Sequence, residues 1–266
     1  MLDKCPHCNK KYRDGATIGI ICPYCGKSIA PKESGDKNTW EEILPPNEEA
    51  QLVATFLQLG ILVLDGSGSM DCETQDGLKK AEAVNESVRE FFKRMKISTN
   101  KNNFKMAVVN FDTKAIRAMD VTDVTALNVK CDYNPMNGLG DQTHLHAGLR
   151  EAEKIAQKFL REEVLGEAIR SVVIIIMTDG LDMEEEKTRT YMAELRKKPY
   201  FDKIRVTACY FKGKDSTEKE IEHCMSYLKE FVSHPDDCRE VFSAEELRDF
   251  FDASMVITKN DKNSII

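Results

Sequence analysis

The chain has 266 residues, of which 41% are hydrophobic, so it can bury a substantial core and is neither a disordered nor a fibrous protein. Its formal net charge of -7 provides no global positive field for a phosphate backbone, which disfavours wholesale nucleic-acid binding. The first residues lack a basic-then-apolar signal-peptide profile, and the longest mostly apolar stretch, residues 52–64, is too short to cross a bilayer. We therefore expect a soluble, cytoplasmic protein with no membrane partner.

Four of the nine cysteines lie near the amino terminus in two C-P-x-C units, Cys5 with Cys8 and Cys22 with Cys25. Thiolates at this spacing can occupy the four corners of a tetrahedron around Zn²⁺. Residues 1–28 contain few aliphatic side chains, so they need a cross-link such as a bound metal ion to fold. The segment resembles a zinc ribbon, and we predict a structural zinc held by all four cysteines, with a redox dithiol as the alternative.

The rest of the chain divides by composition. Residues 29–50 are rich in proline and charge and are expected to form a linker. Residues 51–257 alternate short apolar runs with amphipathic stretches, which is typical of strands and crossover helices in an α/β fold. Residues 258–266 are polar and predict a flexible tail.

Hydrophobic periodicity and capping signals predict the elements of this α/β region in chain order. They are a strand at 61–64, a helix at 81–95, a strand at 104–111, an edge strand at 115–121, a helix at 145–159, the strongest strand at 171–178, a strand at 205–211, and helices beginning at capping boxes at 217–220 and 243–246. Four single cysteines, Cys131, Cys209, Cys224 and Cys238, are expected to be small buried hydrophobes. Cys72 has no basic neighbour in sequence that would activate its thiol as a redox switch.

A second candidate metal site follows the first predicted strand, where the chain reads Asp65-Gly-Ser67-Gly-Ser69-Met. A carboxylate and two hydroxyls on a glycine-containing turn are hard oxygen ligands of the kind that Mg²⁺ or Mn²⁺ prefers. Asp179 ends the strongest predicted strand, and Thr143 precedes a predicted helix. Because ligands gather outside the carboxyl ends of strands in open α/β sheets, we expect these oxygens at one edge of the sheet.

Three features of the sequence resemble the metal-ion-dependent adhesion site of von Willebrand factor type A domains. They are the DGSGSM turn, the threonine of GDQTHLHAGL and the aspartate of IIIMTDG. The resemblance implies a Rossmann-like α/β domain whose mostly parallel central sheet is flanked by helices. It implies that Ser67, Ser69 and Thr143 hold a divalent ion, Mg²⁺ or Mn²⁺. Asp65 and Asp179 would act through water or switch into contact with the ion. One coordination position is then left for a carboxylate of a partner protein.

The resemblance extends over roughly residues 57–254 and predicts a non-enzymatic protein-binding module, an adaptor or regulator in a multi-protein stress or defence system. What is known of similar proteins implies an ATPase, kinase or phosphatase as the partner. No Gly-Lys-Ser or Gly-Lys-Thr follows the GSGSM turn, so the turn does not read as a phosphate-binding loop.

Two other functions stay open at this level. A metal-dependent hydrolase or phosphatase would use the same site with His144 or His146 as the acid–base group, although exposed helix-start residues are the simpler interpretation of both histidines. Nucleic-acid recruitment would use residues 1–38, which carry seven basic against four acidic side chains, but the zinc–thiolate group cancels most of that excess. Asp182 and residues 184–186 are expected to form a solvated helix start.

Overall fold

The structure is a computed structural model that describes residues 56–74, 76–161 and 169–255. All of these residues belong to one compact unit, Leu52–Ile266. The predicted zinc ribbon at residues 1–28, the linker at 29–50 and the tail at 258–266 lie outside the described residues.

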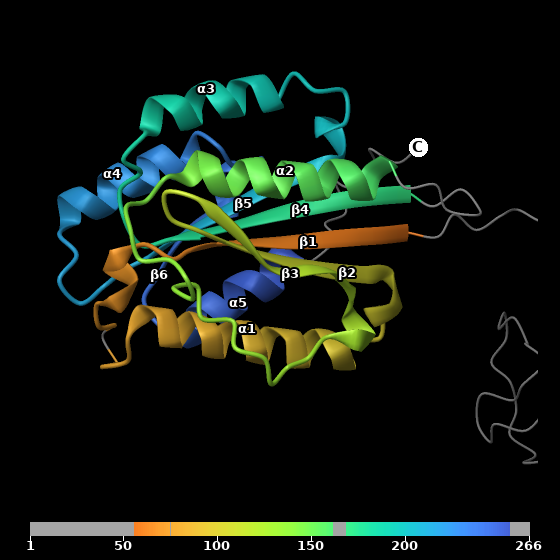
Figure 1. Ribbon diagram of the computed structural model, residues 1–266, viewed down its shortest axis with the longest axis horizontal. Helices are drawn as coiled ribbons and strands as arrows, with labels where there is room; N and C mark the ends of the chain where they lie inside the picture. The colour runs from red at the N-terminus through yellow and green to blue at the C-terminus, as the bar shows by residue number, and fades with distance from the viewer. Residues whose placement is uncertain (1–55, 75, 162–168, 256–266) are drawn as a thin grey trace, which may run out of the picture. The chain divides into compact units, whose positions relative to one another are not determined.

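A six-stranded sheet forms the middle layer, with the strand order β3-β2-β1-β4-β5-β6 (Figure 1). The strands are β1 (Phe56–Asp65), β2 (Phe104–Phe111), β3 (Ala115–Asp123), β4 (Ile169–Thr178), β5 (Ile204–Phe211) and β6 (Cys238–Val241). Every neighbouring pair is parallel except β2 and β3, which are antiparallel. The prediction of a mostly parallel sheet with an edge strand at residues 115–121 is therefore confirmed.

In the described part of the chain, five α-helices cover the two faces of the sheet. They are α1 (Lys80–Ile97), α2 (Leu145–Arg161), α3 (Glu185–Leu195), α4 (Glu218–Lys229) and α5 (Ala244–Ser254). Helices α2, α3 and α4 pack on one face, and α1 and α5 pack on the other (Figure 1). None of the helices that the structure describes combines the length and the apolar character needed to cross a membrane.

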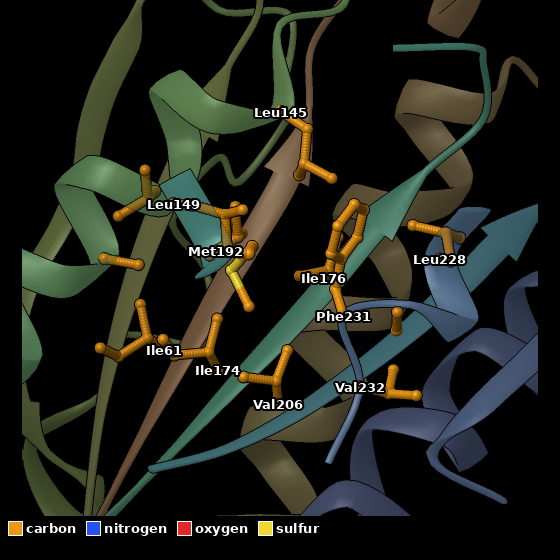
Figure 2. Packing of buried hydrophobic residues seen from close by; sticks show 14 of the residues in the cluster. Ile61, Leu145, Leu149, Ile174, Ile176, Met192, Val206, Leu228, Phe231 and Val232 are labelled. Atoms are coloured by element: carbon orange, nitrogen blue, oxygen red, sulfur yellow. The ribbon is translucent and has the colours of Figure 1, made fainter. Parts of the chain in front are cut away.

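The core consists of two apolar layers, one on each side of the sheet. In the layer shown in Figure 2, Ile61, Ile174 and Val206 project from β1, β4 and β5 toward the helices. Leu149 of α2 and Met192 of α3 pack against them. A central parallel strand needs apolar side chains on both faces, which is why residues 61–64 read as a continuous aliphatic run.

The two predicted capping boxes differ in the structure. At the start of α4, Thr217 and Glu220 cap each other's backbone amides, as predicted. At the start of α5, the Ser243 hydroxyl accepts a hydrogen bond from the Glu246 amide, but the Glu246 carboxylate accepts from Phe242 rather than from Ser243. The second box is therefore only half formed, because the carboxylate reaches one residue further back along the chain.

The single cysteines also depart from the prediction at one position. Cys209, Cys224 and Cys238 are buried, as expected. Cys131 is exposed, because it lies in the irregular segment between β3 and α2 rather than in a strand or a helix face, so its predicted burial is wrong. Cys72 is exposed as well.

Candidate functional site

Asp65 is the last residue of β1, and its side chain is fully buried at the carboxyl edge of the sheet. The Ser67 amide donates a hydrogen bond to Asp65 Oδ1 at 2.8 Å, so the turn folds back onto the carboxylate. The hydroxyl of Thr178, at the end of the neighbouring strand β4, donates to Asp65 Oδ2 at 2.5 Å. Asp65 is therefore fixed by the turn that follows its own strand and by the neighbouring strand β4.

The hydroxyl groups of Ser67 and Ser69 extend the hydrogen bonds around Asp65 to the residue that follows β4. The Ser67 and Ser69 hydroxyl oxygens lie 3.0 Å apart, and the Ser69 hydroxyl donates to Asp179 Oδ1 at 2.8 Å. Asp179 directly follows β4 and is also buried. The structure thus connects Asp65, Ser67, Ser69 and Asp179, which the sequence places in two distant segments.

Close approach of two loops brings Thr143 to the same place. The Gly68 amide donates to the carbonyl of Asp141 at 2.9 Å, and a Cβ atom at Gly66 would stand only 2.2 Å from the carbonyl oxygen of Pro135. Because Gly66 and Gly68 have no side chains, the loop of residues 135–141 can approach the turn after β1 closely. A Cβ at Gly180 would stand 3.5 Å from the Ser69 hydroxyl and 3.5 Å from the Thr143 hydroxyl, so these two hydroxyls face one point.

Asp112, which the sequence analysis did not single out, holds the loop that carries Thr143. It is buried directly after β2, and its Oδ2 accepts hydrogen bonds from the amides of Gly140 and Asp141 at 3.2 and 3.3 Å. Its backbone carbonyl accepts from the His144 amide at 3.1 Å. An aspartate at the end of a predicted strand, on the same edge as Asp65, is the signal that would have found it.

An open cavity of about 470 Å³ lies over this network. Its lining includes Ser67, Ser69, Thr143 and Asp179, and it extends to residues after β5 and at the start of α4. Among the described residues that line it, neither His144 nor His146 is present. The cavity therefore gives a ligand direct access to the hydroxyl groups, and the imidazoles form no part of its wall.

Two buried carboxylates repel each other at the site. Burial, and then the negative charge of Asp179, raises the pKa of Asp65 to about 7, although hydrogen bonds from Thr178 and Ser67 act in the opposite direction. A divalent ion would relieve the repulsion between the two carboxylates. No group of three or more His, Cys, Asp or Glu side chains suited to a metal occurs in the described residues, so a cation here relies on hydroxyl oxygens as well. Oxygen ligands of this kind fit Mg²⁺ or Mn²⁺.

Lys80, another residue that the sequence analysis did not single out, reaches into the site from the first turn of α1. Its Nζ atom lies 2.6 Å from Asp179 Oδ2, and both side chains are buried. The pair joins residues that are 99 positions apart in the chain, and no local pattern predicts it.

Two expectations about the surroundings of the site are wrong. His144 and His146 are not exposed: their side chains are 18% and 13% accessible, their rings stack, and both face Glu184. Burial lowers the pKa of His146. Asp182 is not part of a solvated helix start, because it is buried and accepts hydrogen bonds from the hydroxyls of Thr188 and Tyr227.

The sequence profile of the von Willebrand factor type A domain matches residues 61–181, a stretch that begins within β1, ends just after β4 and contains all five predicted ligands of the divalent ion. The six-stranded, mostly parallel sheet between two layers of helices has the Rossmann-like fold of such a domain. No curated protein matches this sequence.

Solved structures of similar fold include the pilus adhesin SpaC from Lactobacillus rhamnosus GG in its open conformation, with 13% identity and a TM-score of 0.59 over 80% of this chain and 30% of that chain. The PilB minor pilin from Streptococcus sanguinis has 13% identity and a TM-score of 0.54 over 76% of this chain and 61% of that chain. The vWF domain of the type V pili tip protein Mfa5 from Porphyromonas gingivalis has 13% identity and a TM-score of 0.50 over 75% of this chain and 94% of that chain. The present chain spans less than two thirds of the adhesin and of the pilin, and the likeness is one of fold.

Proposed function

We propose that this domain is a non-enzymatic protein-binding module in which Asp65, Ser67, Ser69, Thr143 and Asp179 hold a divalent ion, Mg²⁺ or Mn²⁺. The observation that carries the proposal is the continuous hydrogen-bonded set from Asp65 to Asp179 beneath an open cavity. A bound dication would supply a coordination position that a carboxylate oxygen of a partner protein fills.

Each residue has a distinct task in this proposal. Asp65 and Asp179 provide the negative charge that attracts the ion, and the three hydroxyl groups provide neutral oxygens. Two carboxylates balance the charge of a divalent ion, and the ammonium group of Lys80, 2.6 Å from Asp179, then leaves the loaded site with one net positive charge, which favours an anionic partner over a neutral one. Ser67 and Thr178 keep the Asp65 carboxylate in one orientation through their hydrogen bonds.

The names of the similar structures, a pilus adhesin, a minor pilin and a pili tip protein, support a binding role. The position of the histidines disfavours the hydrolase that would use His144 or His146 as its acid–base group, because such a group must reach the substrate and neither imidazole lines the described cavity. For the partner we propose a protein such as an ATPase, kinase or phosphatase in a cytoplasmic stress or defence system. The zinc ribbon of Cys5, Cys8, Cys22 and Cys25 would add a second contact and increase avidity.

The proposal is tested by titrating the purified chain with Mn²⁺ in a calorimeter. We expect one site in residues 52–266, and we expect Ser67→Ala and Thr143→Ala to weaken it about tenfold or more, because each removes an oxygen ligand. Thr125→Ala, at an exposed threonine away from the site, is the matched control and should bind like the wild type. Equal affinity of all four proteins would rule out this set of ligands.

Affinity capture from the native host then tests the partner. Wild-type protein in Mg²⁺ is compared with wild type in EDTA and with the variant that carries both Asp65→Ala and Ser67→Ala. We expect a partner that is lost in both controls and whose binding also depends on one of its own acidic residues. Partners that persist without the ion would place binding elsewhere on the chain.

A further inference from the structure

A buried lysine side chain contacts the proposed ion site. The Lys80 side chain is 5% accessible and the Asp179 side chain is 0% accessible, and their Nζ and Oδ2 atoms lie 2.6 Å apart. Because the other oxygen of Asp179 accepts from Ser69, both oxygens of this carboxylate already have a donor. A divalent ion that approaches Asp179 therefore meets a positive charge that is part of the protein.

The position of Lys80 is unfavourable for a lysine apart from its acidic neighbours, Asp179 and Glu220. It is the first residue of α1, where the helix dipole disfavours a cation, and its charge is removed from water. Lys79, the preceding residue, behaves like an ordinary surface lysine: its side chain is 52% accessible and pairs with Asp71 at 2.6 Å. The direct contact with Asp179, together with a longer-range attraction to Glu220, thus compensates for burying Lys80.

The neighbouring loop leaves room for this side chain. A Cβ atom at Gly213 would stand 2.7 Å from Lys80 Cε and 2.9 Å from Nζ, so a larger residue at this position would displace the amine. The Gly213 amide donates to the Ser216 hydroxyl at 2.9 Å, which fixes the loop beside the lysine. Lys80 and Ser216 both line the cavity that contains Ser69 and Thr143.

We propose that Lys80 is a resident cation that competes with the divalent ion for Asp179 and thereby lowers the affinity of the site for that ion. The inference rests on the proposed function, because it assumes that the ion binds between Asp65 and Asp179. With both Asp65 and Asp179 ionised, the ammonium group of Lys80 leaves these three side chains with a single net negative charge, against two if the lysine were neutral. Weak binding of the ion by the free protein follows from this lower charge.

The test measures Mn²⁺ affinity by calorimetry for the wild type, Lys80→Gln and Lys80→Met. Glutamine keeps a donor for Asp179 without the charge, and methionine keeps the shape without either, so the two variants separate charge from hydrogen bonding. Lys79→Gln is the matched control, because it removes a neighbouring charge that is exposed. Circular dichroism melts in EDTA establish that each variant is folded.

We expect both Lys80 variants to bind Mn²⁺ about tenfold or more tightly than the wild type, with Lys79→Gln within about twofold of it. If Lys80 had only a structural role, the result would be the opposite, because its loss would misplace Asp179 and weaken the binding of Mn²⁺. Unchanged or weaker binding by folded Lys80→Gln, with measurable binding by the wild type, overturns the inference and leaves the proposed function intact. If no protein in the series binds Mn²⁺, the proposed function fails and the inference fails with it.

Discussion

Among the residues that the structure describes, four buried aspartates lie at the carboxyl edge of the sheet, and each one accepts hydrogen bonds from a different set of donors. Asp65 and Asp179 bind the glycine–serine turn, and Asp112 holds the loop before α2. Asp182 joins three helices, since it accepts hydrogen bonds from the Leu145 amide of α2 and from hydroxyls on α3 and α4. Buried carboxylates of this kind are stable only with such partners.

This role of Asp182 predicts the effect of its removal. Asp182→Ala leaves the Thr188 and Tyr227 hydroxyls buried without their acceptor, so the free energy of unfolding should fall by about 2–4 kcal/mol. Chemical denaturation measures the change, and Asp202→Ala, at an exposed aspartate, is the control, with an expected change within about 0.5 kcal/mol. Similar stability of the two variants would show that the network contributes little.

At the scale of elements, the distance between α2 and the sheet is set by a glycine. A Cβ atom at Gly148 would stand 2.8 Å from Val63 Cγ1 and 2.9 Å from Phe111 Cδ1, and both of these side chains are fully buried. Helix α2 begins at Leu145, two residues after Thr143. The distance between this helix and the sheet therefore also positions the loop that carries Thr143.

We therefore expect Gly148→Ala to destabilise the protein by about 1 kcal/mol or more, although alanine is the better helix former. Overpacking against Val63 and Phe111 is the cause, since neither side chain has space to yield. Ala147→Gly, at the neighbouring partly exposed position, measures the intrinsic helix preference alone and should be destabilising by up to about 1 kcal/mol. A gain in stability for Gly148→Ala would contradict the tight contact.

At the scale of the whole molecule, the two proposed metal sites differ in chemistry and belong to different parts of the chain. Thiolates select zinc, whereas hydroxyls and carboxylates select Mg²⁺ or Mn²⁺. The oxygen site lies in a unit, Leu52–Ile266, that has its own core on both faces of its sheet. A unit with its own core can keep its site when a separate metal module is lost.

This separation predicts the outcome of metal analysis. Purified protein should contain one zinc per chain, and Cys22→Ser with Cys25→Ser should remove it because two of its four ligands are lost. Mn²⁺ titration of the same variant should match that of the wild type. Zinc that persists in the double variant would exclude the predicted ribbon site, and loss of Mn²⁺ binding would show that the two sites are coupled.

Much of the fold was predictable because its signals are local. The strand at residues 104–111 and the helices that contain residues 81–95 and 145–159 appear where apolar periodicity places them. The short strand β6 was not predicted, because its four residues, CREV, contain no apolar run or clear alternation. Helix α3 was foreseen only as an acidic helix start.

The sequence by itself determined most of the strands and helices, with β6 and the full extent of α3 as exceptions, and the two motifs that end β1 and β4, because periodicity and turn residues act over a few neighbouring positions. Only the tertiary structure decided which groups surround those motifs. Lys80 meets Asp179, and Asp182 meets Tyr227, across 99 and 45 positions of chain. Such contacts depend on sheet register and on the close approach of loops, and these are set by the packing of the whole core rather than by any local pattern.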